Sequence, residues 1–161
     1  MSSIVIPQTT RNRYLSGIAA LNLPSAAGTG DWHFLQTFFV QRSRRSTGFI
    51  CGLGCEIDTT AFLGDVGVFE CSKLLKSLDI EFVGDAAYSA NHTRAVADLV
   101  IAAIRIGRNV DHLCIDDWLP KMSDKERLIA MLQQAYSNMN EELRQALNVW
   151  VLSNLPKDGL K

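Results

Sequence analysis

Asp31, Trp32 and His33 form the first group of side chains suited to chemistry, and they follow a glycine-rich stretch. Histidine is the one side chain whose ordinary pKa suits proton transfer near neutral pH. Asp31 could orient the imidazole of His33, with Trp32 as a wall of the site. Packing explains the same residues, with Trp32 in the core, Asp31 as a helix cap and His33 bonded to a backbone carbonyl. We favour packing, because isolated histidines are more often structural.

A second group runs from Tyr88 through Asn91, His92 and Arg94 to Asp98, around the expected start of a helix. A helix N-terminus presents free amide donors and a partial positive charge, so Asn91, His92 and Arg94 could bind an anion or a phosphate. In the alternative interpretation Asn91 caps the helix, and Arg94 and Asp98 form an i, i+4 ion pair. Capping alone accounts for Asn91, so the structural interpretation is favoured here too.

A catalytic site would require the two histidine segments to meet. His33 and His92, supported by Asp31 and Arg94, would then form an acid–base pair for ester or phosphodiester hydrolysis. The sequence contains no phosphate-binding glycine loop, no nucleophile elbow and no metalloprotease helix. A small hydrolase or nuclease is therefore the alternative function, and no cofactor is expected.

The cysteines and acidic residues do not indicate a metal site. Cys51 and Cys55 are separated by three residues, and His112 and Cys114 form the only other soft-ligand pair nearby, so the spacing is poor for zinc. The four cysteines are expected to be free thiols that pack as small apolar side chains. Asp116 and Asp117 could hold Mg²⁺ or meet a basic partner, but such acids more often cap helices.

Charge is distributed unevenly along the chain. The net charge is −1, yet residues 1–48 carry 5 − 1 = +4 and the other 113 residues carry 11 − 16 = −5. The total argues against a protein that coats nucleic acid through charge alone. Five arginines could still form a basic patch that contacts nucleic acid, although solvated surface charge is the favoured interpretation. They are Arg11, Arg13, Arg42, Arg44 and Arg45.

The bulk properties predict one domain over residues 1–161. The length lies near the common domain size, and 47% of the residues are hydrophobic, as in ordinary globular proteins. No apolar run approaches the roughly 20 residues of a membrane-spanning helix. The N-terminus does not read as a secretory signal, so a cytoplasmic location is expected.

Hydrophobic spacing predicts an α+β fold with a small mixed or antiparallel sheet. A central buried helix is expected at about 91–106, and a C-terminal helical hairpin at about 124–154 with a Ser123–Glu126 capping box. Residues 156–161 are expected to fray. The remaining elements expected from the pattern are a helix from Thr9 or Thr10 to Leu21, strands within 48–54 and 80–83, strand-and-turn structure over 62–69 and a short helix over 71–78.

Three phrases resemble an uncharacterised group of small bacterial proteins encoded beside toxin–antitoxin or phage-defence components. They are residues 10–21, Gly30-Asp-Trp-His33 and Ala90-Asn-His-Thr-Arg-Ala-Val-Ala-Asp-Leu99. The resemblance covers roughly the first 100 residues and carries no catalytic residue. It implies a bacterial protein that binds a partner encoded nearby.

The sequence therefore favours a non-enzymatic interaction protein that binds or neutralises a partner protein. The acidic helical half would hold that partner, and the basic N-terminal region would be available for nucleic acid. The expected binding residues are Trp32, Tyr88, Asn91, Arg42, Arg44 and Arg45. Neither a membrane partner nor a metal ion is expected, and the sequence leaves the oligomeric state open.

Overall fold

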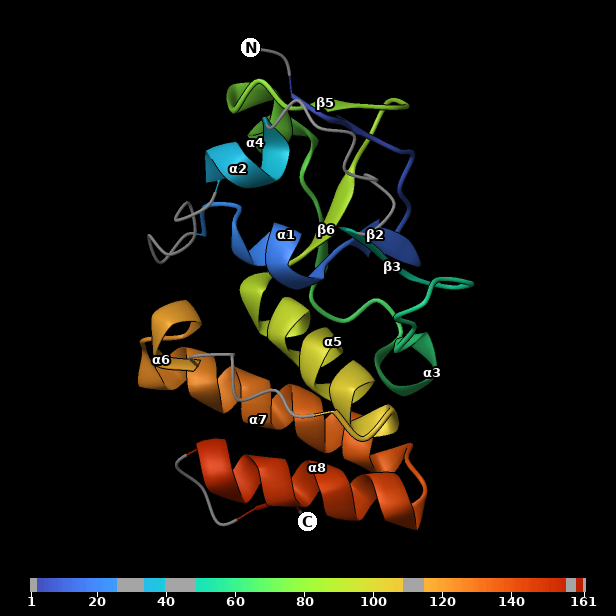
Figure 1. Cartoon of the computed structure of the whole chain (residues 1–161), viewed down its shortest axis with the longest axis vertical. Helices are drawn as coiled ribbons and strands as arrows, with labels where there is room; N and C mark the ends of the chain where they lie inside the picture. The colour runs from blue at the N-terminus through green and yellow to red at the C-terminus, as the bar shows by residue number, and fades with distance from the viewer. Residues whose placement is uncertain (1–2, 26–33, 40–48, 109–114, 156–158, 161) are drawn as a thin grey trace.

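A mixed four-stranded sheet organises the first half of the chain in the computed structural model (Figure 1). The structure describes residues 3–25, 34–39, 49–108, 115–155 and 159–160. The strand order is β3-β2-β6-β4, in which β2 and β6 are parallel and the outer pairs are antiparallel. A separate pair, β1 and β5, is parallel. The strands are β1 Val5–Ile6, β2 Arg13–Leu15, β3 Ile50–Gly52, β4 Val68–Glu70, β5 Glu81–Phe82 and β6 Tyr88–Ala90.

Both faces of the four-stranded sheet are buried. Successive strand residues point to opposite faces, so in β2 Tyr14 joins one hydrophobic cluster and Leu15 the other. Their partners in β3, Cys51 and Ile50, divide in the same way. The Leu15 side packs with Phe38 and with short helices, and the Tyr14 side packs with the long helices.

Three long helices cover the Tyr14 side and form the lower half of the molecule in Figure 1. The first of them, α5, lies between the sheet and the antiparallel pair α7 and α8. The predicted α+β fold, the central helix and the C-terminal hairpin are thus confirmed. The helices are α1 Gly17–Leu21, α2 Phe34–Phe38, α3 Thr60–Leu63, α4 Ser72–Ser77, α5 His92–Arg105, α6 Ile115–Trp118, α7 Met122–Ser137 and α8 Glu141–Asn154.

Local capping and one apolar stripe explain the long helices. The Asn91 side chain accepts from the Arg94 amide at the start of α5, and Asn140 accepts from the Leu143 amide at the start of α8. Each cap satisfies an amide that has no intrahelical partner. The inward face of α7 consists of Leu128, Met131, Leu132 and Ala135, all buried as the spacing predicts.

The helix predicted from Thr9 or Thr10 to Leu21 is wrong over its first half. The Thr10 hydroxyl accepts from the amides of Asn12 and Arg13, which forms a turn that leads into β2. Helix α1 begins only at Gly17, whose φ of 61° lies in the left-handed region that favours glycine. Sheet pairing of residues 13–15 therefore overrides their helical spacing.

One further expectation, about a helix start, differs from the structure. Helix α7 begins two residues earlier than the predicted capping box requires, with Lys121 at the N-cap and no side-chain cap. Ser123 consequently lies inside the first turn. Near the C-terminus, Leu160 is buried and its amide donates to Asn148 Oδ1, although it belongs to the segment expected to fray. The burial of its side chain against the protein and the bond to α8 hold Leu160 in place.

The shorter predicted elements are largely confirmed. The 48–54 strand appears as β3, the 71–78 helix as α4 and the 80–83 strand as β5. Residues 62–69 contain the end of α3, a turn and the start of β4, as the two glycines of that stretch predict. No helix in the described part of the chain is long and apolar enough to cross a membrane.

The packing of α8 gives a first prediction. Leu147 is fully buried, whereas Val149 on the same helix is 65% exposed. Leu147→Ala should lower the free energy of unfolding by about 2–5 kcal/mol, because it leaves a cavity. Val149→Ala should change it by less than about 0.5 kcal/mol. Urea denaturation followed by circular dichroism measures both, and equal effects would show that α8 does not pack as described.

Candidate functional site

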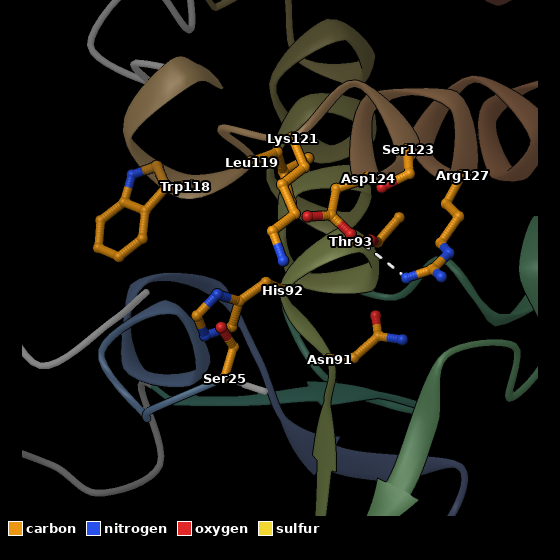
Figure 2. A pocket seen from close by; sticks show the side chains of 10 residues that line it. All are labelled: Ser25, Asn91, His92, Thr93, Trp118, Leu119, Lys121, Ser123, Asp124 and Arg127. Carbon is orange, nitrogen blue, oxygen red and sulfur yellow. Dashed lines mark hydrogen bonds and ion pairs between the residues drawn. The ribbon is translucent and has the colours of Figure 1, made fainter. Parts of the chain in front are cut away.

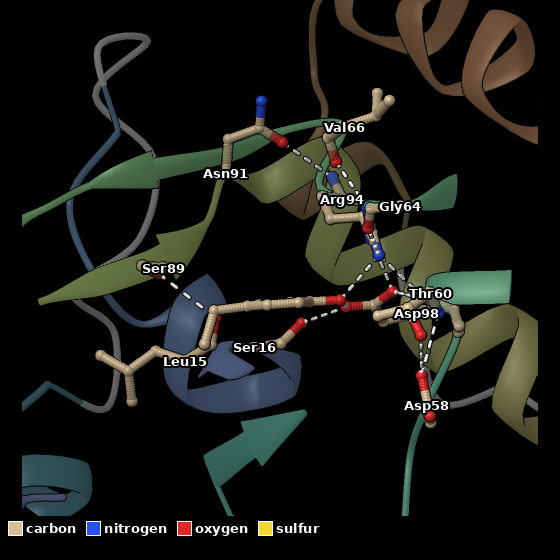
Figure 3. A network of polar contacts seen from close by, with 12 residues as sticks. Leu15, Ser16, Asp58, Thr60, Gly64, Val66, Ser89, Asn91, Arg94 and Asp98 are labelled. Carbon is tan, nitrogen blue, oxygen red and sulfur yellow. Dashed lines mark hydrogen bonds and ion pairs between the residues drawn. The ribbon is translucent and has the colours of Figure 1, made fainter. Parts of the chain in front are cut away.

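A buried ion pair lies between the sheet and the long helices (Figure 3). Arg94 and Asp98, one turn apart on α5, have fully buried side chains, and Arg94 Nε lies 2.8 Å from Asp98 Oδ1. Buried charges are costly unless every lone pair and proton finds a partner. Each of the two side chains is accordingly surrounded by hydrogen-bonding groups from other elements.

Asp98 accepts four hydrogen bonds. Its Oδ1 accepts from Arg94 and from the Thr59 hydroxyl, and its Oδ2 accepts from the hydroxyls of Tyr14 and Ser16. Burial, together with the nearby Asp98 carboxylate, raises the pKa of Tyr14 far above its usual value. The tyrosine therefore stays a neutral donor to Asp98 throughout the pH range in which proteins fold.

Arg94 connects the same centre to the loop before β4. It donates to the backbone carbonyls of Gly64 and Val66, and also to the hydroxyls of Tyr14 and Thr59. Gly67 has a φ of 76°, and a Cβ added there would lie 2.8 Å from Arg94 Cβ. A glycine is required at this close approach, because any side chain would push the loop away from the arginine.

This network decides between the two interpretations of the Tyr88–Asp98 segment for Arg94 and Asn91. Asn91 caps α5, and Arg94 and Asp98 pair as the structural interpretation predicts. The pair is buried rather than at the surface, so the loss of either partner would leave an uncompensated charge in the core. The Arg94 guanidinium points into the protein and is not among the residues that line the hollow described below.

A hollow nevertheless exists at the start of α5, where the start of α7 also lies (Figure 2). Its volume is about 330 Å³. Two cations, three hydroxyl groups and two rings line it, contributed by segments distant in sequence. The residues that line it are Ser25, Asn91, His92, Thr93, Trp118, Leu119, Lys121, Ser123, Asp124 and Arg127.

His92 forms one wall of this hollow and is largely buried. Its Nε2 donates to the Leu23 carbonyl at 2.7 Å, which fixes the proton on that nitrogen. The Trp118 ring of α6 meets the imidazole edge-on, with 6.3 Å between the ring centroids. Burial lowers the pKa of His92, so the ring is neutral at physiological pH.

The cations of the hollow come from α7. Figure 2 shows the Lys121 amine directed into the hollow toward His92. Arg127 lies at the opposite side, where its Nη1 is 3.3 Å from Asp124 Oδ1. With Asp124 paired to Arg127, the positive charge of Lys121 is left uncompensated among the described lining residues. The hollow therefore favours an anion.

The sequence predicts an anion site at this helix start from Asn91, His92 and Arg94, whereas the cations that line the hollow are Lys121 and Arg127. Lys121, Ser123 and Arg127 follow Arg94 by 27 to 33 residues, and no local motif connects them with His92. Only the return of α7 toward the start of α5 brings them together. The proximity of helices α5 and α7 depends on tertiary packing, which spacing along the chain does not encode.

Of the predicted site residues not yet considered, the structure describes Tyr88 but not the other six. Tyr88 is described; it lies away from the hollow, half-buried, with the Arg11 guanidinium 5.3 Å from its ring centroid. His33 has no described position, so its distance from His92 stays open. The predicted residues outside the described part are Asp31, Trp32, His33, Arg42, Arg44 and Arg45.

The described residues contain no cluster of three or more His, Cys, Asp or Glu side chains that could hold a metal ion. Cys51 and Cys71 are buried free thiols, as expected, and Cys55 is half-buried. Burial raises the pKa of Cys51 and Cys71 to about 12, so both stay protonated and unreactive near neutral pH. Cys114 and His112 lie outside the described residues.

Helix α8 presents a second candidate surface, which we call the outer face of α8. Most of its exposed side chains fall within one side of the helical circumference. Carboxylates occupy the first turn, and Val149 and Leu152 are 65% and 55% exposed further along. The outer face consists of Glu141, Glu142, Gln145, Val149, Leu152 and Ser153.

Removing one member of the buried ion pair should be costly. Arg94→Met leaves the Asp98 carboxylate buried without its cation and should lower the free energy of unfolding by about 3–5 kcal/mol. The double variant Arg94→Met, Asp98→Leu should recover part of this loss, because no buried charge remains. Denaturant unfolding tests both. A single variant within about 1 kcal/mol of wild type would contradict the described network.

His92 should make stability depend on pH. Its folded pKa is below the ordinary value of 6.5, so the unfolded chain binds a proton more readily than the folded chain as the pH falls. The contribution of neutral His92 is complete above about pH 6.5 and declines below it. His92→Gln keeps an N–H donor for Leu23.

The measurement is the unfolding free energy of wild type and His92→Gln between about pH 5 and pH 8, the range over which histidine titrates. The difference in unfolding free energy between wild type and His92→Gln should shrink or change sign as the pH falls, because only the wild type loses the contribution of neutral His92. His33 and His112 are present in both proteins and cancel in the comparison. Parallel curves over the whole range would contradict a buried neutral imidazole.

The chain matches no protein-family model, no curated protein and no solved structure. The fold, the hollow at the starts of α5 and α7, and the outer face of α8 are the features that indicate function.

Proposed function

We propose that the chain is a non-enzymatic binding protein that holds a partner protein through the outer face of α8. The observation that carries the proposal is the exposure of Val149 and Leu152 next to one another on this face. They are about one turn apart on a helix whose opposite side carries the buried residues Leu147, Trp150 and Val151. Apolar side chains rimmed by polar ones are typical of protein interaction sites.

The charges on the outer face indicate the chemistry of the partner. Glu141 and Glu142 form no ion pair with any described residue, and they lie on the same side of α8 as Val149. A partner that presents arginine or lysine beside an apolar patch would complement both halves of the face. Complementary charge would also speed the encounter between the two proteins.

The resemblance to small bacterial proteins encoded beside toxin–antitoxin or phage-defence components supports the same proposal. It implies a cytoplasmic partner encoded by a neighbouring gene. Binding alone would then be the activity, as when an antitoxin neutralises its partner. Nucleic acid contact through the basic N-terminal region stays a prediction, because Arg42, Arg44 and Arg45 lie outside the described residues.

The alternative, a hydrolase that uses His33 and His92, has no specific observation in its favour. His92 Nε2 already donates to the Leu23 carbonyl. The guanidinium of Arg94, which that mechanism places beside the substrate, donates to carbonyls and to buried hydroxyls instead. Both groups have structural partners in the positions where catalysis would need them exposed.

Co-expression with the protein encoded by the neighbouring gene tests the proposal. The two proteins should co-purify, and the double variant Val149→Glu, Leu152→Glu should lower the affinity by at least about tenfold. The matched control is Leu53→Glu, Val83→Glu, which adds the same charge at residues that are 53% and 49% exposed outside α8. The control should bind like wild type.

Three outcomes would overturn the proposal. The neighbouring protein fails to bind, or the α8 variant binds like its control, or the face serves self-association instead. The last is seen when the purified chain alone is a dimer by light scattering and Val149→Glu, Leu152→Glu makes it a monomer. Thermal unfolding of each variant confirms that the added glutamates leave the fold intact.

A further inference from the structure

We propose that the hollow at the starts of α5 and α7 binds a small molecule that carries a phosphate monoester on a flat, largely apolar body, as mononucleotides do. The inference concerns a different surface from the outer face of α8, and it stands whether or not α8 holds a partner.

The polar part of the hollow supplies the features of a phosphate site. Lys121 directs its amine into the space (Figure 2), and no described residue neutralises it. The hydroxyls of Thr93 and Ser123 line the same space and can donate to a second and a third oxygen. A lysine with several neutral donors suits the distributed charge of a phosphate.

Arg127 and Asp124 set the balance of charge. Their separation of 3.3 Å makes them a pair, and the Arg127 side chain is 73% exposed. The guanidinium has donors beyond the one that faces Asp124. The lining therefore carries one net positive charge, from Lys121, Arg127 and Asp124 together, which favours a phosphate monoester over a neutral ligand.

A second hollow adjoins the first through shared lining residues and supplies the apolar wall. It has a volume of about 350 Å³ and shares Ser25, Asn91 and His92 with the polar hollow. The rest of its lining is mainly apolar and includes Leu23, Phe69 and Leu74. Phe69 is 39% exposed, so its ring is accessible to a bound molecule.

The two hollows together fit one ligand with two chemically different ends. His92 lies at the boundary, and its neutral ring, fixed by Leu23, can face an apolar body without adding charge. The phosphate would lie against Lys121 and the flat body against Phe69. Such division of a pocket into an apolar wall and a few placed polar groups is typical of small-molecule sites.

Calorimetric titration of the full chain with adenosine monophosphate tests the proposal, with inorganic phosphate and adenosine as the partial ligands. The monophosphate should bind at least about tenfold more tightly than either partial ligand, because only it occupies both hollows. Lys121→Gln should weaken its binding by at least about tenfold. The matched control Lys73→Gln removes the same charge from exposed α4 and should change the affinity by less than about twofold.

The variant Phe69→Ala tests the contribution of the apolar hollow separately from that of the polar hollow. It should weaken the monophosphate and leave inorganic phosphate unchanged, because phosphate does not reach the apolar part. The proposal is overturned if adenosine monophosphate shows no binding up to about 5 mM, if it binds no better than inorganic phosphate, or if Lys121→Gln and Lys73→Gln bind alike. Thermal unfolding verifies that each variant is folded, which the exposure of Lys121 leads us to expect.

Discussion

The buried pair of Arg94 and Asp98 is the interaction on which the arrangement of the molecule depends. Two charges removed from water are tolerated only when all their hydrogen-bonding groups are satisfied. Here the partners come from β2, from the residue before α1, from Thr59 and from the loop of residues 64–66. If any of these segments moves away, a buried charge loses a partner, so the network specifies one arrangement of the sheet against α5.

The candidate surfaces follow from that arrangement. With α5 held against the sheet, Asn91 and His92 lie at the edge between the sheet and the helical half. Helix α7 packs along α5 and brings Lys121 and Ser123 to the same edge. Helix α8 packs with its buried side against α7 and α5, so its outer face points away from the protein. The hollow and the outer face of α8 are therefore at different places in one packed helical layer.

His92 is the point where buried and functional chemistry meet. The ring joins the end of α1 to α6 through Leu23 and Trp118, and it also borders both hollows. A neutral, fixed imidazole in this position can hold the wall of a site without supplying acid–base chemistry. Arg94 shows the same principle more strongly, since an arginine that spacing places beside an anion site is instead part of the core.

The sequence by itself determined the α+β class, the helices α5, α7 and α8, and the cap at Asn91, because apolar periodicity and capping act between residues close in the chain. It also indicated the Arg94–Asp98 pair, which is one helical turn long. Tertiary structure decided that residues 13–15 form a strand rather than a helix, that the pair is buried, and that Lys121 rather than Arg94 faces the hollow at His92. These outcomes depend on contacts between residues 28 to 84 positions apart, whose proximity no local spacing encodes.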